Sequence, residues 1–127
     1  MPERIAAALG IPVLAARLPI NLAGVTDGSR IWVDDRLTEV ERRCAIAHEL
    51  VHIDAGHTHH QPPKIETWVR RQAAEWLIPW EALWRHRHVV NLHELADHLE
   101  VTHPVLLDRL HHLTDHQKHQ LAEGLAP

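Results

Sequence analysis

The chain contains neither phenylalanine nor tyrosine, and its 127 residues include a single cysteine. A hydrophobic core must therefore come from aliphatic residues and from the five tryptophans. Trp76, Trp80 and Trp84 recur every four residues and are expected to form a buried stripe. Cys44 has no partner for an internal disulfide, so we expect a small buried side chain rather than a metal ligand. The length fits one domain over residues 1–127.

The sequence also lacks an excess of positive charge and any long apolar run. Its formal net charge is −4, which argues against a general binder of nucleic acid or of a membrane surface, because both need a basic face. No apolar run approaches the roughly 20 residues of a membrane span, and no charged-then-apolar leader is recognisable. We therefore expect a cytoplasmic protein without a membrane segment.

Histidine is abundant, with 14 residues, and one pair of histidines has a spacing of chemical interest. Residues 48–52 read His-Glu-Leu-Val-His. On an α-helix, residues four apart lie one turn above each other, so His48 and His52 can present their imidazoles to a single ion. Glu49 follows the first histidine, as does the general base of many zinc hydrolases. In a chain so rich in histidine the pentad alone can arise by chance, so it needs independent support.

The residues around the pentad predict a helix within an α+β fold. Thr38 and Glu41 fit a capping box at the start of the helix, Gly56 marks its end, and apolar residues recur between them at helical spacing. Before this helix, residues 18–33 combine alternating apolar residues with turn residues, which predicts a small antiparallel sheet. A short helix over residues 2–9 is expected to precede the sheet.

The chain after the pentad is expected to be helical. A loop over residues 57–63 carries three histidines, which we expect to be solvated rather than to flank a cleft. A long helix then runs from about residue 64 to residue 78 and ends at Pro79. Three further helices are expected to begin at Asn91, at Thr102–Pro104 and at Thr114.

A catalytic zinc site has three protein ligands, and the pentad supplies two of them. The long helix after the loop is the simplest source of the third, and Glu66 lies at the start of its inward face, 14 residues after the second histidine. Glu75, on another face of the same helix, is one alternative. His59 in the loop is the other, but the spacing H-E-x-x-H-x-x-G-x-x-H would need glycine and histidine where the chain has Ala55 and Thr58.

Three stretches together resemble the ImmA/IrrE family of metallopeptidases: residues 42–52, Glu66 with Val69, and residues 73–79. The resemblance covers about residues 20–80 well and the tail more loosely. It implies a zincin-like fold, in which a short antiparallel sheet packs on the pentad helix. Residues 1–80 would form the catalytic core and residues 81–127 a helical region.

The same resemblance implies the chemistry of the site. His48, His52 and Glu66 match the zinc ligands of the family, and Glu49 matches its catalytic base. The implied activity is that of a zinc metalloendopeptidase, and the implied substrate is a DNA-binding repressor. Cleavage of the repressor would lift repression in a phage, a mobile element or a stress circuit.

The chain departs from the family pattern at Arg70. The family has a residue there that can accept a hydrogen bond from a ligand histidine and so fix its tautomer. Arginine has no acceptor, so this role is either empty or filled by another residue such as Asp54. The lack of tyrosine is a second departure, and it leaves histidine, arginine, tryptophan or backbone N–H groups to stabilise an oxyanion.

A non-catalytic alternative remains open: a protein-binding module or antirepressor with a structural metal, or none, that acts through its helical tail. Residues 92–113 are similar to a helix-turn-helix, but they carry four acidic residues and one arginine. Phosphates would repel such a surface, so direct binding of nucleic acid is not expected. We expect these helices to close one side of the cleft or to dock a protein partner.

Overall fold

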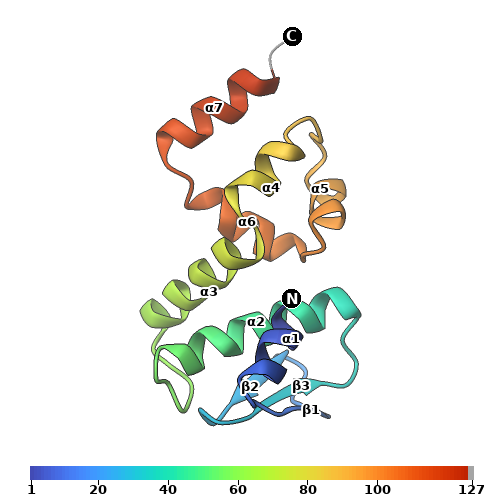
Figure 1. Cartoon of the computed structure of the whole chain (residues 1–127), viewed down its shortest axis with the longest axis vertical. Coiled ribbons are helices and arrows are strands. Elements are labelled where there is room, and N and C mark those ends of the chain that lie inside the picture. Colours follow the sequence, from blue (N-terminus) through green and yellow to red (C-terminus); the bar gives the residue numbers. More distant parts are fainter. Residues whose placement is uncertain (126–127) are drawn as a thin grey trace.

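The computed structural model describes residues 1–125 and has an α+β architecture, with a small sheet at one end of the molecule and helices at the other (Figure 1). The predicted domain extends to residue 127, and its last two residues lie outside the described part. The elements are α1 (Pro2–Ala8), β1 (Val13–Ala16), β2 (Gly24–Thr26), β3 (Ile31–Asp34), α2 (Glu39–Asp54), α3 (Pro63–Leu77), α4 (Trp80–Arg85), α5 (Leu92–Leu99), α6 (His103–His111) and α7 (Asp115–Leu125).

Helix α2 carries the pentad and begins at the predicted capping box. The hydroxyl of Thr38 accepts a hydrogen bond from the Glu41 N–H at 3.2 Å, and the Glu41 carboxylate accepts one from the Thr38 N–H at 2.9 Å. Such a cap stabilises a helix by about 1 kcal/mol. Beyond the end of the helix, Gly56 has a φ of 80°, a left-handed conformation that ends helices and favours glycine.

The sheet is mixed rather than wholly antiparallel, and its strand order is β1-β3-β2. Strands β2 and β3 are antiparallel, as predicted, whereas β1 and β3 are parallel. The chain reverses direction twice between β1 and β3, once before β2 and once after it, so β1 and the central strand β3 point the same way. The alternating residues 18–22 form a loop instead of a strand, and the buried Asp34 carboxylate accepts the Leu18 N–H of that loop at 3.0 Å.

Helix α2 lies between two hydrophobic clusters. On one side Ile46 is buried with Ile31 and Val33 of β3. On another side Cys44 and Ala47 join a cluster built from α3, α4, α5 and α6. Cys44 is 8% exposed, which confirms the expectation of a small buried side chain. Burial of each large aliphatic side chain stabilises the folded chain by about 1.5–3 kcal/mol. Packing on two sides therefore fixes the position of α2.

Polar contacts attach the helical region to the rest of the chain. The buried Arg109 of α6 donates from Nε to the Ile78 carbonyl at 2.7 Å, and the Arg43 guanidinium of α2 donates to the Glu100 carbonyl in the turn between α5 and α6. Glu100 has φ 56° and ψ 44°, a left-handed conformation that turns the chain sharply. Within residues 1–125, no helix is long and apolar enough to cross a membrane.

The tryptophans do not form the expected buried stripe. Trp76 and Trp84 are 40% and 38% exposed, and the half-buried Trp80 stacks on Trp84 with ring centroids 6.2 Å apart. The spacing of four residues predicts one face only if a single helix continues, but α3 ends at Leu77 and Pro79 caps the start of α4. The break rotates α4 relative to α3, so the expectation is wrong for Trp76 and Trp84.

Candidate metal centre

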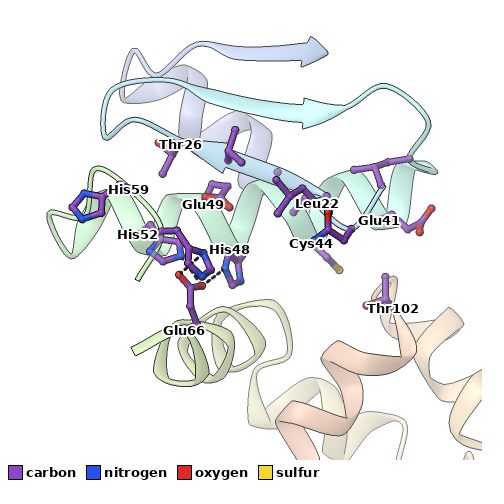
Figure 2. Close-up of a pocket in the computed structure, with 17 residues that line it drawn as sticks. Leu22, Thr26, Glu41, Cys44, His48, Glu49, His52, His59, Glu66 and Thr102 are labelled. Atoms are coloured by element: carbon purple, nitrogen blue, oxygen red, sulfur yellow. Dashed lines mark hydrogen bonds and ion pairs between the residues drawn. The ribbon is translucent and has the colours of Figure 1, made fainter. Parts of the chain in front are cut away.

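Three side chains from two helices meet at one point. The Nε2 atoms of His48 and His52 on α2 lie 3.2 and 3.1 Å from the same oxygen, Oε1 of Glu66 on α3 (Figure 2). Ligand atoms that surround a tetrahedral zinc ion at 2.0–2.2 Å lie roughly 3.3–3.5 Å from one another. Two imidazole nitrogens and a carboxylate oxygen thus converge at nearly the spacing that a bound metal ion needs.

Local sequence explains why these groups meet. His48 and His52 are one helical turn apart, and His52 is 4% exposed. Glu66 lies in the first turn of α3, and the buried Val69 and Ala73 continue its face along the helix. Packing of this face against α2 aims the Glu66 carboxylate at the two imidazoles.

Glu49 lies beside the histidines in a buried position. His48, Glu49 and His52 each offer a ligand atom, and these atoms lie within 4.8 Å of one another, so the group could hold a metal ion. Burial, with a smaller contribution from the negative charge of Glu66, raises the pKa of Glu49 to about 7. A cation beside Glu49 would favour its ionised form and lower this pKa. Gly24 of β2 packs against the side chain, since a Cβ there would lie 3.3 Å from Cγ of Glu49.

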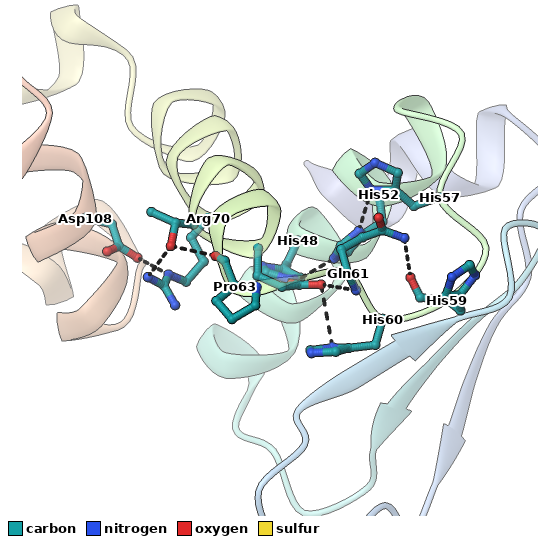
Figure 3. Close-up of polar contacts among 11 residues, drawn as sticks. His48, His52, His57, His59, His60, Gln61, Pro63, Arg70 and Asp108 are labelled. Carbon is teal, nitrogen blue, oxygen red and sulfur yellow. Dashed lines mark hydrogen bonds and ion pairs between the residues drawn. The ribbon is translucent and has the colours of Figure 1, made fainter.

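His57, from the loop after α2, orients one of the two imidazoles. Its Nδ1 lies 2.9 Å from Nδ1 of His52 (Figure 3). If Nε2 of His52 presents its lone pair to a metal ion, the ring proton is on Nδ1, and His57 accepts it. The sequence left this role empty or open to another residue such as Asp54; in the structure His57 is the residue that contacts Nδ1 of His52, and Asp54 is exposed. Arg70 points elsewhere, with its Nε 3.7 Å from the Asp108 carboxylate of α6.

The loop also holds Glu66. The carboxylate oxygen Oε2 accepts a hydrogen bond from the Gln61 backbone N–H at 3.0 Å and lies 3.6 Å from Nδ1 of His60 (Figure 3). The pKa of Glu66 is lowered: burial raises it, but the Gln61 N–H together with His52 and His48 outweighs that effect. The pKa of His48 is lowered as well, by burial first and by His52 second, which favours the neutral imidazole that a metal requires.

The comparison with known families agrees with this geometry. The model of the IrrE N-terminal-like domain family, Peptidase_M78, matches residues 6–111. The chain belongs to this family. The match confirms the resemblance drawn from the sequence and extends it through α5 and α6, so these helices are part of the family domain. Searches of curated proteins and of solved structures gave no match.

In this IrrE-like domain the two residues that the sequence offered as alternatives to Glu66, His59 and Glu75, contact other side chains. Nδ1 of His59 contacts the Thr58 hydroxyl at 3.1 Å. Glu75 forms an ion pair with Arg71 at 3.1 Å. Of the three side chains that the sequence offered as a third ligand, Glu66 is thus the one that meets both imidazoles.

A groove of about 650 Å³ runs along α2 of the IrrE-like domain and passes over the metal centre (Figure 2). One wall is β2 with the loop before it, the floor is α2, and the opposite side includes Glu66 and Thr102. His59 and His60 are exposed, as expected. They also line one end of the groove, whereas the sequence analysis expected the loop histidines not to flank a cleft. No spacing rule links the loop histidines to the pentad, because the loop conformation decides where they lie.

Proposed function

We propose that this chain is a zinc-dependent metallopeptidase that cleaves a regulatory protein, with His48, His52 and Glu66 as zinc ligands. The single observation that carries the proposal is the Glu66 oxygen that faces both imidazole nitrogens, in a chain of a peptidase family. Glu49 is the competing carboxylate. We assign it the role of base because Glu66 Oε1 is the oxygen that contacts both Nε2 atoms, while Glu49 packs beside Gly24.

The donor set fits zinc, which binds imidazole nitrogen and carboxylate oxygen and keeps one position open in catalytic sites. When bound, zinc would supply a Lewis acid that lowers the pKa of a water molecule from about 15.7 towards 7 and polarises the scissile carbonyl. Glu49 accepts a proton from the attacking water and passes it to the leaving amine. His48 and His52 hold their lone pairs for the metal only when neutral, so activity falls as the pH drops below the titration range of histidine.

We propose a DNA-binding repressor as the substrate, on the strength of the family resemblance. The groove supports a polypeptide substrate because it runs beside β2, which within residues 1–125 is an edge strand that pairs with β3 alone. An extended segment can add to such an edge through backbone hydrogen bonds. A repressor substrate implies a cytoplasmic enzyme, and a phage or mobile element is the genetic context that we propose.

One observation favours a second function, that of a protein-binding module or antirepressor without catalysis. Trp76 and Trp84 are large side chains that are 40% and 38% exposed. Exposed tryptophans are frequent at the centres of protein interfaces. A partner could therefore dock on the helical region whether or not the groove is catalytic.

Two measurements separate the proposals. Purified protein should contain about one zinc ion per chain, which His52→Ala removes and Glu49→Gln retains. Co-expression with repressors encoded beside the gene should yield cleaved repressor with the wild type and intact repressor with Glu49→Gln. If Glu49→Gln still relieves repression, the peptidase proposal is wrong and the binding module is favoured.

A further inference from the structure

The groove continues to both sides of the metal centre, and its two arms differ in chemistry (Figure 2). The arm towards the end of α2 is lined by polar side chains, those of Thr26, His59 and His60. The arm towards the start of α2 ends at Thr102, and apolar side chains line it: Leu22, Leu37, Cys44 and Ala45. We call this second part the apolar arm.

The apolar arm favours an aliphatic side chain over an acidic one. Cys44 and Ala45 form its floor and are 8% and 7% exposed, while Leu22 reaches in from the loop before β2. The groove residues, all within the described chain, include neither lysine nor arginine. Glu41 stands at the far end, where its carboxylate is bound to the Thr38 N–H. An acidic side chain would enter this arm without a partner, whereas an aliphatic one would gain about 25 cal/mol for each Å² that it buries.

The end of the apolar arm is fixed in place by contacts between α2 and the helical region. Cys44 of α2 and Thr102 of the turn before α6 both line this end of the arm. One residue earlier on α2, Arg43 donates to the Glu100 carbonyl. The turn between α5 and α6 is thereby held as a wall of the groove rather than as a separate surface.

The apolar arm is also close to the reacting centre. Cys44 precedes His48 by four residues, which is just over one turn of α2 or about 6 Å along the helix axis. An extended peptide advances about 3.3 Å per residue. A side chain in the apolar arm therefore belongs to a residue within one or two positions of the bond that lies at the metal centre.

We infer that the apolar arm is a specificity subsite, which takes one aliphatic side chain of the substrate next to the scissile bond. The α5–α6 turn, through Thr102, limits its depth. This inference rests on the proposed peptidase function and names the kind of sequence that the enzyme cleaves. It also assigns the helical region a part in selecting the substrate.

The test uses pools of fluorogenic octapeptides in which one position is fixed as Leu, Val, Asp or Lys and the others are mixed. The zinc-loaded full chain should cleave the Leu and Val pools at least about tenfold faster than the Asp pool, at a single position beside the cleaved bond. Leu22→Lys puts a cation in the arm and should reduce the Leu-to-Asp ratio by at least about tenfold. The matched control is Leu14→Lys on β1, an exposed leucine on the opposite edge of the sheet, which should leave the ratio unchanged.

Binding of the same pools to the Glu49→Gln protein, followed by fluorescence anisotropy, separates the subsite from the chemistry. If no pool is cleaved but the aliphatic preference in binding is present and Leu22→Lys removes it, the peptidase proposal fails, and the apolar arm remains a binding site for an aliphatic side chain without a role in cleavage. The subsite is overturned if the protein cleaves or binds the Leu, Val and Asp pools equally well. It is also overturned if Leu22→Lys leaves the Leu-to-Asp ratio unchanged. Absence of both cleavage and binding overturns both proposals.

Discussion

His52 and His57 face each other through the same ring nitrogen, with their Nδ1 atoms 2.9 Å apart. One of the two nitrogens must donate and the other accept, so the pair fixes the tautomers of both rings. For a metal-binding His52 the donor is its own Nδ1–H. His57 is then the partner that keeps the lone pair of His52 on the side of Glu66.

Removal of this partner should weaken metal binding without removing a ligand. We expect His57→Ala to lower the zinc affinity about 10- to 100-fold, the usual effect of losing a residue that orients a ligand. The measurement is a competition titration against a chromophoric chelator. His59→Ala, a change in the same loop, should leave the affinity within about threefold of the wild type. Equal losses in the two variants would show that the loop as a whole, and not the His52–His57 contact, is responsible.

Gly24 should control the position of the base. A methyl group there would lie 3.3 Å from Cγ of Glu49 and 3.2 Å from the Trp32 carbonyl, so either Glu49 or β2 must shift. We expect Gly24→Ala to lower kcat by roughly tenfold, since small displacements of a catalytic group are costly. Zinc content should stay unchanged because the three atoms nearest to the added methyl group belong to Trp32, Glu49 and Ala45 and not to a proposed ligand. A variant with normal kcat would mean that Glu49 tolerates the shift.

The raised pKa of Glu49 makes the stability of the metal-free protein depend on pH. The pKa is about 7 in the folded chain, against an ordinary value of 4.5. A raised folded-state pKa gives stability that is complete below pH 4.5 and is lost as the pH rises through 7. The loss amounts to roughly 3 kcal/mol, because each pKa unit corresponds to about 1.4 kcal/mol.

The variant Glu49→Gln should not lose stability as the pH rises through 7, because glutamine stays neutral. In the presence of a chelator, it should match the wild type in urea unfolding near pH 4.5 and exceed it at pH 8. A difference that does not change with pH would refute the buried, protonated state of Glu49.

Asp34 should give the opposite pH dependence. Its pKa is lowered from 3.8 to about 2, chiefly by the hydrogen-bonded Arg36 side chain, while burial acts against the shift. A lowered folded-state pKa gives stability that is present above 3.8 and is lost as the pH falls to about 2. Asp34→Asn should therefore lower Tm at pH 7 and flatten the decline on acidification. Asp35→Asn is the control, because its ion pair with Arg17 is exposed and such pairs contribute little.

The pentad helix and its partner could be predicted because both depend on local patterns. Thr38 and Glu41 carry a capping signal, four-residue spacing aligns His48 with His52, and the apolar period of the next helix identifies the face of Glu66. Each of these signals lies within a short stretch of sequence. They need no knowledge of how distant segments meet.

The parts that could not be predicted depend on the path of the chain in space. Strand β1 lies at residues 13–16, before the segment of residues 18–33 in which the sequence predicts the sheet, and its direction relative to β3 follows from the two chain reversals between them. His57 reaches His52 because of the loop conformation, which residue spacing does not specify. The exposure of Trp76 and Trp84 follows from the rotation at Pro79, and the sequence marks the break without giving its angle.

The two clusters that enclose α2 have a consequence for dividing the molecule. A chain cut after residue 80 would leave the apolar side chains of Cys44, Ala47 and Leu77 facing water, since their neighbours lie in α5 and α6. Such a fragment would lose one of the two packing surfaces of the helix that carries both histidines. The helical region therefore serves as structural support for the candidate metal centre, and residues 1–80 should not fold as an independent unit.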